Sequence, residues 1–407
     1  MDIKVGGNRF TEWLRRGDWG KLGGSILLII GVAFLLFWRI GHLVPVLSPS
    51  EITFTDTTHS IHQLIKDPIN APVRAVDYTL RIIHFGNIIT FRTVSAVFAV
   101  VALYCFYILM LNWHTRRMSI FGTILLASSS WFLSVGRTAT ADILLVTMPL
   151  LLIMTSYLTF RKKAKLRSIA YLALIASTAL ALYVPFMFWL VLIIYAVYWR
   201  QLYMVLKKVP KKAIIAGSVV LIIGLLPLIY GIIHDWHIVL RLTGIPETWL
   251  PIKQYGIHAK EITLSLAYRT VPHPELRLGT LPLLDAVSAI LLILGLYYYW
   301  LRRHSYTAIM LVILGVISFI LLVLSPHPAY DSMALLIPVS YIAVVAGLTL
   351  LLQQWFTIFP RNNIARGIGV GIVSLLVAMC VFYHFERYFV AWPQSPETKK
   401  AFSLTSH

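Results

Sequence analysis

Residues 91–111 read FRTVSAVFAVVALYCFYILML, and Arg92 is the only charged side chain among them. A helix of about 20 residues, rising about 1.5 Å per residue, crosses the hydrocarbon core of a bilayer. The run therefore predicts a transmembrane helix that begins beside a charged group.

The same pattern recurs along the whole chain. Eleven apolar runs are long enough to span a membrane, and they begin near Leu22, Phe91, Ser119, Asp142, Ser168, Phe186, Ala213, Asp285, Tyr306, Met333 and Gly367. The fifth and sixth runs are short and meet at residues 183–185, so they form either two spans or one kinked span. The sequence predicts an all-α polytopic membrane protein whose residues 1–407 form a single transmembrane domain.

The composition agrees with a membrane protein. Hydrophobic residues make up 58% of the chain and charged residues 13%, against about 25% charged residues in soluble domains. The net charge of +19 comes from Lys and Arg in short clusters between the apolar runs. Such clusters orient spans and contact anionic headgroups, so we expect membrane lipids and no nucleic acid among the partners.

The charges also predict an orientation. If the N-terminus is cytoplasmic, the segments on that side hold 21 of the 35 Lys and Arg but only 3 of the 16 Asp and Glu. This is the positive-inside pattern, and it requires an odd number of spans, which favours eleven over ten. We therefore expect a plasma-membrane protein with its C-terminus outside. The first run, residues 22–38, lacks a small-residue cleavage site and is expected to remain as an anchor.

Two outer segments are long, residues 41–90 and 234–284, and a short outer tail covers residues 386–407. Within the first loop, residues 60–65 and 74–85 are amphipathic and are expected to form short helices on the membrane surface. Eleven of the 13 His fall on the outer side. Any chemistry is therefore expected at the outer face.

The first outer loop carries two candidate catalytic acids, Glu51 and Asp56, in residues 48–56, SPSEITFTD. A carboxylate near a membrane surface is partly desolvated, which raises its pKa and makes it a usable base. Ser48 and Glu51 also match a capping box, so capping and catalysis both stand as interpretations of Glu51, and they can coexist.

A divalent metal is the one cofactor that the sequence leaves open. Asp56, His59 and His62 are spaced three residues apart, so they share a helical face and could hold such an ion. Simple solvation of the two His is the alternative, and no metal ligand is assigned.

Arginines near the outer face are candidate phosphate ligands. Arg137, before Asp142 in the turn between the third and fourth runs, could bind phosphate bidentately, or it could extend toward the interface. Asp142 is either a pocket residue or an N-cap. Arg92 at the second run is a phosphate ligand or a headgroup anchor, and Arg269 is one of several cations in the second outer loop.

Several short motifs lie in the outer loops or next to the outer ends of the predicted spans. The first loop opens with Pro49-Ser-Glu51, residues 68–72 read PINAP, residues 91–96 read FRTVSA, and residues 278–285 read LGTLPLLD. Gly136-Arg137 and Asp142 lie at the top of the third and fourth spans. There is no P-loop or dinucleotide fingerprint, so a sugar transferase of this kind would need a lipid-carried donor.

This layout resembles the GT-C glycosyltransferases, in the branch of the protein O-mannosyltransferases and the aminoarabinose lipid A transferase. The resemblance implies a polyprenyl-phosphate sugar donor, outer-face activity, and pocket positions for Arg137 and Asp142. Glu51 takes the place of the family's Glu, but Ser50 stands where the family usually has an Asp, its favoured base. Glu51 or Asp56 then serves as the base, or the enzyme is inactive.

The predicted function is inverting transfer of a hexosyl or pentosyl group from the polyprenyl-phosphate donor to a lipid, glycan or protein acceptor. Arg137, aided by Arg92 or Arg269, would stabilise the leaving phosphate. The alternatives are a transporter or lipid-handling protein, and a degenerate non-catalytic relative. Transporters commonly bury charges within their spans, whereas the acids here gather at the outer rim, which favours the transferase.

Overall fold

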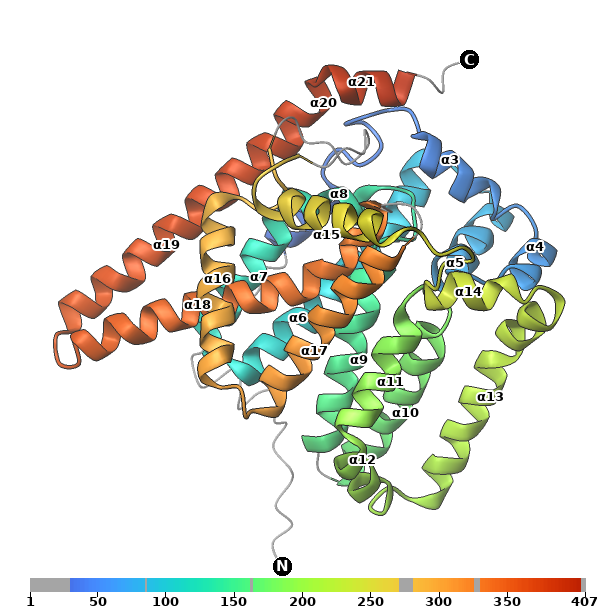
Figure 1. Cartoon of the computed structure of the whole chain (residues 1–407), viewed down its shortest axis with the longest axis horizontal. Helices are drawn as coiled ribbons and strands as arrows, with labels where there is room; N and C mark the ends of the chain where they lie inside the picture. Colours follow the sequence, from blue (N-terminus) through green and yellow to red (C-terminus); the bar gives the residue numbers. More distant parts are fainter. Residues whose placement is uncertain (1–29, 85, 162–163, 271–280, 326–329, 404–407) are drawn as a thin grey trace, which may run out of the picture.

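The computed structural model describes residues 30–84, 86–161, 164–270, 281–325 and 330–403, and within these ranges the regular structure is helical (Figure 1). The apolar run that begins near Leu22 lies mostly outside the described residues, although residues 30–37 are helical. The predicted all-α fold is confirmed.

Each later apolar run coincides with a helix or with a bent pair of helices. These are α6 (Ile88–Trp113), α7 (Arg116–Ser128) with α8 (Ser130–Arg137), α9 (Leu144–Arg161), α10 (Ala164–Ala181), α11 (Met187–Val197) with α12 (Trp199–Leu206), α13 (Lys211–His234), α16 (Ala286–Leu301), α17 (Tyr306–Leu324), α18 (Ile337–Ile358) and α19 (Asn363–Glu386).

Five described helical segments are long and apolar enough to cross a membrane, and up to seven are if each of two bent pairs counts as one span. Three further helices, α9, α10 and α16, are apolar but shorter. The chain is therefore a multi-pass membrane protein. The number eleven stays a prediction, because helix length and composition alone do not fix how many of these segments cross the bilayer.

Two apolar runs are bent rather than straight. The axes of α7 and α8 differ by 61° and those of α11 and α12 by 73°. At the first bend Ser129 caps α8, and its hydroxyl accepts a hydrogen bond from the Phe132 N–H at 3.4 Å.

The ambiguous break near Pro185 separates two helices, α10 and α11, which lie side by side (Figure 1). The turn between them contacts both long loops. The Asn70 N–H donates to the Tyr183 carbonyl at 2.8 Å, and the Phe186 N–H donates to the Leu242 carbonyl at 2.7 Å.

The long loops contain short helices of their own. The first loop forms α3 (Pro49–Asp56), α4 (Ile61–Lys66) and α5 (Ala71–Ile82), and the second forms α14 (His237–Thr243) and α15 (Ile252–Ala267). The tail continues from α19 through a π-helical turn, η2 (Arg387–Ala391), into α20 (Trp392–Gln394) and α21 (Pro396–Ser403). Figure 1 places α3, α15 and α21 in the upper part of the molecule and α5 and α14 near mid-height on the right, all away from α12.

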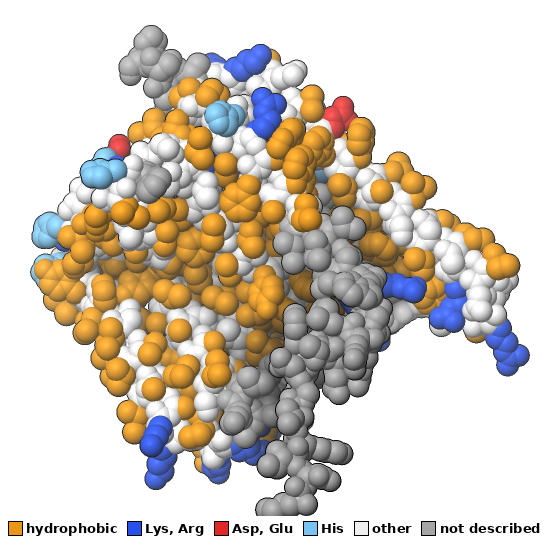
Figure 2. Space-filling model, turned by 180° about the vertical axis from the view of Figure 1, so that it is seen from behind, with side chains coloured by type: hydrophobic (Ala, Val, Ile, Leu, Met, Phe, Trp, Pro, Cys, Tyr) orange, Lys and Arg blue, Asp and Glu red, His pale blue; other side chains and the backbone are white. Residues whose placement is uncertain are grey.

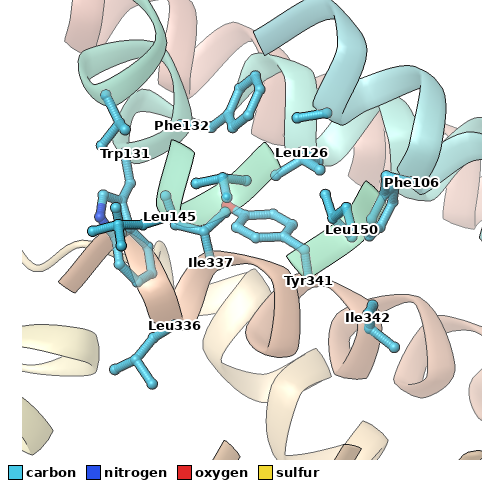
Figure 3. Close-up of a cluster of buried hydrophobic side chains, with 14 of the residues drawn as sticks. Phe106, Leu126, Trp131, Phe132, Leu145, Leu150, Leu336, Ile337, Tyr341 and Ile342 are labelled. Carbon is cyan, nitrogen blue, oxygen red and sulfur yellow. The ribbon is translucent and has the colours of Figure 1, made fainter. Parts of the chain in front are cut away.

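The core lies where α18 crosses the centre of the bundle. Residues 332–358 have 89% of their most apolar window buried, the largest share among the candidate spans. Figure 3 shows the Tyr341 ring among side chains that include Phe106, Phe132 and Leu145. Tyr341 is 0% exposed. This packing fixes the positions of the helices to which the loops at the upper end are connected.

The surface is dominated by hydrophobic side chains, as expected for contact with lipid. Figure 2 shows them over most of the visible face, with Lys and Arg at the lower and right-hand edges and also at the top, and the visible His on the left and at the top. Which of these ends faces the cytoplasm stays a prediction.

Candidate active site

A cavity of about 660 Å³ lies where the two long loops meet. Its walls come from α3, from residues 67–74, from residues 140–142 before α9, and from α14. The lining residues are Pro49, Ser50, Thr53, Phe54, Thr57, Asp67, Ile69, Asn70, Arg74, Thr140, Ala141, Asp142, Pro185 and Arg241. The volume is within the usual range of about 300–1,000 Å³ for ligand pockets. We call it the loop cavity.

Asp142 is the candidate that the structure places in this cavity. It is half-buried, and the Thr140 hydroxyl donates to its Oδ2 at 2.7 Å. This contact orients the carboxylate at the wall, directly before α9.

Arg241 of α14 is the most exposed cation of the cavity wall, with 48% of its side chain exposed. Its Nη1 lies 3.4 Å from Asp67 Oδ2, and its Nη2 lies 3.3 Å from Asp235 Oδ2. Charge-assisted hydrogen bonds are usually about 2.7–2.9 Å long. These longer contacts are therefore loose, and they can be exchanged for contacts with an anion.

Arg74 of α5 has a different role, because it is only 4% exposed. It donates to the carbonyls of Asp67, of Ile69 at 3.1 Å and of Thr57 at 2.8 Å. Burial lowers the pKa of the guanidinium and Asp67 opposes that shift, but an arginine remains charged at neutral pH. Arg74 thus braces the loop that carries Asp67.

Glu51 does not line the cavity. Its carboxylate is 0% exposed and forms an ion pair with Arg92. Oε1 accepts from Arg92 Nε at 2.8 Å and from the Ala139 N–H at 2.7 Å, while Oε2 accepts from Arg92 Nη2 at 2.8 Å and from the Ser48 N–H at 2.9 Å. These four donors occupy the acceptor positions of the carboxylate. We therefore revise the prediction that Glu51 is the base.

The capping interpretation of Glu51 is confirmed. Both halves of the capping box are present, since the Glu51 N–H also donates to the Ser48 hydroxyl at 3.2 Å. All three nitrogens of the Arg92 guanidinium donate hydrogen bonds in the same network. Besides the bonds to Glu51, they donate to the carbonyls of Val44 at 2.6 Å and Val46 at 3.0 Å. With 5% of its surface exposed, Arg92 has no access to a phosphate or to a lipid headgroup.

Arg137 is also enclosed. It is 4% exposed, donates to the Leu35 carbonyl and, at 2.7 Å, to the Trp38 carbonyl, and lies 4.8 Å from the centre of the Phe389 ring. It joins the first helix to the C-terminal segment rather than lining the loop cavity. Its predicted role as a phosphate ligand is revised for this reason.

Asp56 and Arg269 are exposed and lie outside the loop cavity. Asp56 Oδ1 lies 3.4 Å from His59 Nε2, while the Arg81 guanidinium lies 2.9 Å from His59 Nδ1. A cation in this position opposes a second positive charge. Among the described residues, no group of three or more His, Cys, Asp or Glu could hold a metal ion.

Three charged residues of the cavity wall were absent from the sequence-based prediction: Asp67, Arg74 and Arg241. The contact between Arg241 and Asp67 joins positions 174 residues apart, so no local spacing signals it. The only available signal was that both residues belong to the long loops.

A second polar cluster, Ser130, His384 and Asp285, has the composition of a catalytic triad. His384 Nε2 lies 3.0 Å from Asp285 Oδ1, and His384 Nδ1 lies 3.2 Å from the Ser130 hydroxyl. Ser130 is 0% exposed, and none of these three side chains lines a cavity described here. Asp285 caps α16, so the cluster joins helix ends.

No family model and no curated protein matches this sequence. Solved structures are similar in fold, among them ArnT from Cupriavidus metallidurans in the apo state, with 12% identity and a TM-score of 0.57, and the same protein bound to undecaprenyl phosphate, with 13% identity and a TM-score of 0.53. Both alignments cover 94% of this chain and 78% and 76%, respectively, of ArnT. The chain has the ArnT fold.

ArnT is the aminoarabinose lipid A transferase, a GT-C glycosyltransferase. The fold expected from the sequence resemblance is therefore confirmed, on a match that covers nearly the whole chain. At 12–13% identity the likeness to ArnT is one of fold, so the chemistry of the loop cavity has to be argued from its own residues.

Proposed function

We propose that this chain is a membrane glycosyltransferase that moves a sugar from a polyprenyl-phosphate donor to a lipid, glycan or protein acceptor at the outer face of the plasma membrane. The supporting observation is the loop cavity, where Asp142 and Arg241 approach one volume from different elements. The fold adds support, because one of the two ArnT structures is bound to undecaprenyl phosphate.

Arg241 is the proposed phosphate ligand. Its guanidinium is half-exposed, and within the described part of the chain it makes loose contacts with Asp67 and Asp235. A phosphate would replace both carboxylates, and two of its oxygens would accept from Nη1 and Nη2 in a bidentate geometry. The charge of Arg241 would then stabilise the phosphate as it leaves.

Asp142 is the proposed general base, in place of Glu51 and Asp56. It would accept the proton of the acceptor hydroxyl while the hydroxyl oxygen bonds to the anomeric carbon of the sugar. The bond between that carbon and the phosphate oxygen breaks, and the polyprenyl phosphate leaves with the electron pair. A single displacement of this kind inverts the anomeric configuration.

The test is a transfer assay with full-length protein in liposomes, supplied with a labelled polyprenyl-phosphate sugar and with an envelope extract as the acceptor source. Release of polyprenyl phosphate and labelling of the extract are both measured. Asp142→Asn should lower the rate by about 100-fold or more, since a general base contributes about 10²–10⁴-fold. Arg241→Gln should mainly raise the donor concentration at which the transfer rate is half-maximal.

Asp56→Asn is the matched control, because Asp56 is an exposed acid outside the cavity and should keep its activity. Full activity of Asp142→Asn together with loss of activity in Asp56→Asn would reverse the assignment of the base. Donor binding without any release by the wild type would support a lipid-handling protein instead.

A further inference from the structure

A second cavity, of about 260 Å³, lies near the opposite end of α9 from Asp142. Its wall includes the last residue of α6, the C-terminal half of α9, the α11–α12 bend and the first turn of α17. The residues used in the argument are Trp113, Ser156, Phe160, Tyr198, Gln201 and Tyr306. Ser156 follows Asp142 by 14 residues in the sequence, which is roughly 20 Å along a helix. We call this second cavity the distal cavity.

Trp113 and Ser156, which line the distal cavity, each carry a buried polar atom without a partner among the described residues. Within the described part of the chain, Trp113 Nε1 and Ser156 Oγ have no hydrogen-bond partner, and Ser156 is 3% exposed. An indole N–H can only donate, and a buried donor without an acceptor carries a free-energy cost. The cavity is thus suited to a ligand that offers an oxygen acceptor.

The rest of the wall suits hydrocarbon. The ring centres of Phe160 and Tyr198 are 5.4 Å apart, and those of Tyr198 and Tyr306 are 6.4 Å apart. The volume of about 260 Å³ is below the usual size of a pocket that encloses a whole small ligand, about 300–1,000 Å³. The occupant is therefore expected to leave part of its length outside, as a membrane lipid does.

The loops at this end of the helices are basic. Residues 112–118, 200–212 and 302–305 contain Lys and Arg but no Asp or Glu. Arg200 adjoins Gln201 of the cavity wall, and Arg303 precedes Tyr306 by three residues. Basic pockets between helices at the cytoplasmic side attract the headgroups of anionic lipids.

We propose that the distal cavity binds one anionic glycerophospholipid. An ester carbonyl of the lipid accepts hydrogen bonds from Trp113 and Ser156, the start of the acyl chain packs on the aromatic rings, and the phosphate lies among the basic residues. The site is separate from the loop cavity and does not depend on the transferase proposal.

The test uses native mass spectrometry of the full-length, delipidated protein in detergent, titrated with dioleoyl phosphatidylglycerol or with dioleoyl phosphatidylcholine. The wild type should bind the first lipid about tenfold more tightly. Ser156→Phe and Gln201→Trp fill the cavity and should bring binding down to the phosphatidylcholine level. Trp113→Phe keeps most of the volume but removes the N–H, and it should lose about threefold.

The control is Val312→Phe, which enlarges a 51% exposed side chain of α17 outside the cavity wall and should leave the lipid preference unchanged. Equal binding of the two lipids by the wild type would overturn the proposal. So would an equal loss in Val312→Phe and in the filled variants, because that result indicates only annular lipid. If both filled variants fail to fold, an unchanged lipid preference in Trp113→Phe contradicts the proposal.

Discussion

The ion pair between Glu51 and Arg92 shows how single residues hold the loop cavity in place. The exposed fractions of the two side chains are 0% and 7%, and Glu51 also accepts from the Ala139 N–H next to the cavity residue Thr140. The pair thus links α3, α6 and the 139–142 turn. Its direct role is to position the cavity wall.

Replacing Glu51 with Gln is expected to destabilise the protein, because the variant leaves the Arg92 charge buried without its counter-ion. Removing one partner of a buried pair costs about 3–5 kcal/mol. The melting temperature of the detergent-purified variant should fall clearly. A Glu51→Gln protein with a wild-type melting temperature and no transferase activity would instead support the original assignment of Glu51 as the base.

Asp77 of α5 predicts a pH dependence. Its side chain is 1% exposed, its Oδ1 has no hydrogen-bond partner in the described structure, and burial raises its pKa to about 7, against the opposing charge of Arg81. The folded state therefore binds this proton more tightly than the unfolded chain does. Its contribution to stability is present below about pH 4 and is lost as the pH rises to about 7.

Asp77→Asn removes this titration, so its melting temperature relative to wild type should be higher at pH 8 than at pH 5. Each unit of pKa difference corresponds to about 1.4 kcal/mol, which makes the effect measurable. Parallel melting temperatures for the two proteins across this pH range would contradict the assignment.

What the sequence could predict at this scale depended on the distance along the chain. The capping box was visible, because Ser48 and Glu51 are three residues apart. The ion pair was not, since 41 residues separate Glu51 from Arg92. Residue type alone makes Arg137 and Arg92 candidate phosphate ligands, but their burial is a property of the folded packing.

At the scale of elements, the contact between α16 and α18 depends on two glycines, because a side chain at either position would collide with the other helix. A Cβ at Gly347 would lie 2.0 Å from the Leu291 carbonyl oxygen, and one at Gly295 would lie 1.7 Å from the Ala343 carbonyl oxygen. Small residues let helix backbones approach closely inside a membrane. This contact holds the helix that follows Asp285 against the buried α18.

Gly347→Ala should therefore destabilise the protein by about 1–3 kcal/mol, the usual effect of overpacking. Gly371→Ala on α19 is the matched control, because nothing lies within 4 Å of a Cβ there, and it should be neutral or slightly stabilising. The melting temperatures of the two variants are compared, and that of Gly347→Ala should be the lower one. Equal effects would show that the helix contact is looser than described.

Apolar runs predicted the helices well, because each span must bury its backbone polar groups within itself. They could not predict the bends at Ser129 and Tyr198, since the hydropathy pattern continues across both. The break at residues 182–186 was ambiguous in the sequence. The contacts of Asn70 with Tyr183 and of Phe186 with Leu242 resolve it, and these contacts come from loops far along the chain.

For the whole molecule, sidedness is the prediction that determines where the chemistry takes place. Lys207 and Lys260 are both exposed and are expected on opposite sides of the membrane. The native Cys105 and Cys380 are buried, so single Cys variants can be labelled on the natural background. Lys260→Cys should react with an impermeant maleimide in intact cells, whereas Lys207→Cys should react only after permeabilisation. The reverse pattern would place the loop cavity inside the cell.

The donor-binding role of the loop cavity can be measured with a photoactivatable polyprenyl phosphate. The reagent is crosslinked to the full-length protein in liposomes, and the labelled peptides are identified by mass spectrometry. We expect label in the peptides that contain Asp67, Asp142 and Arg241, competed by unlabelled polyprenyl phosphate and reduced in Arg241→Gln. Competed label confined to the distal cavity, or label that Arg241→Gln leaves unchanged, would contradict the proposal that the loop cavity binds the donor.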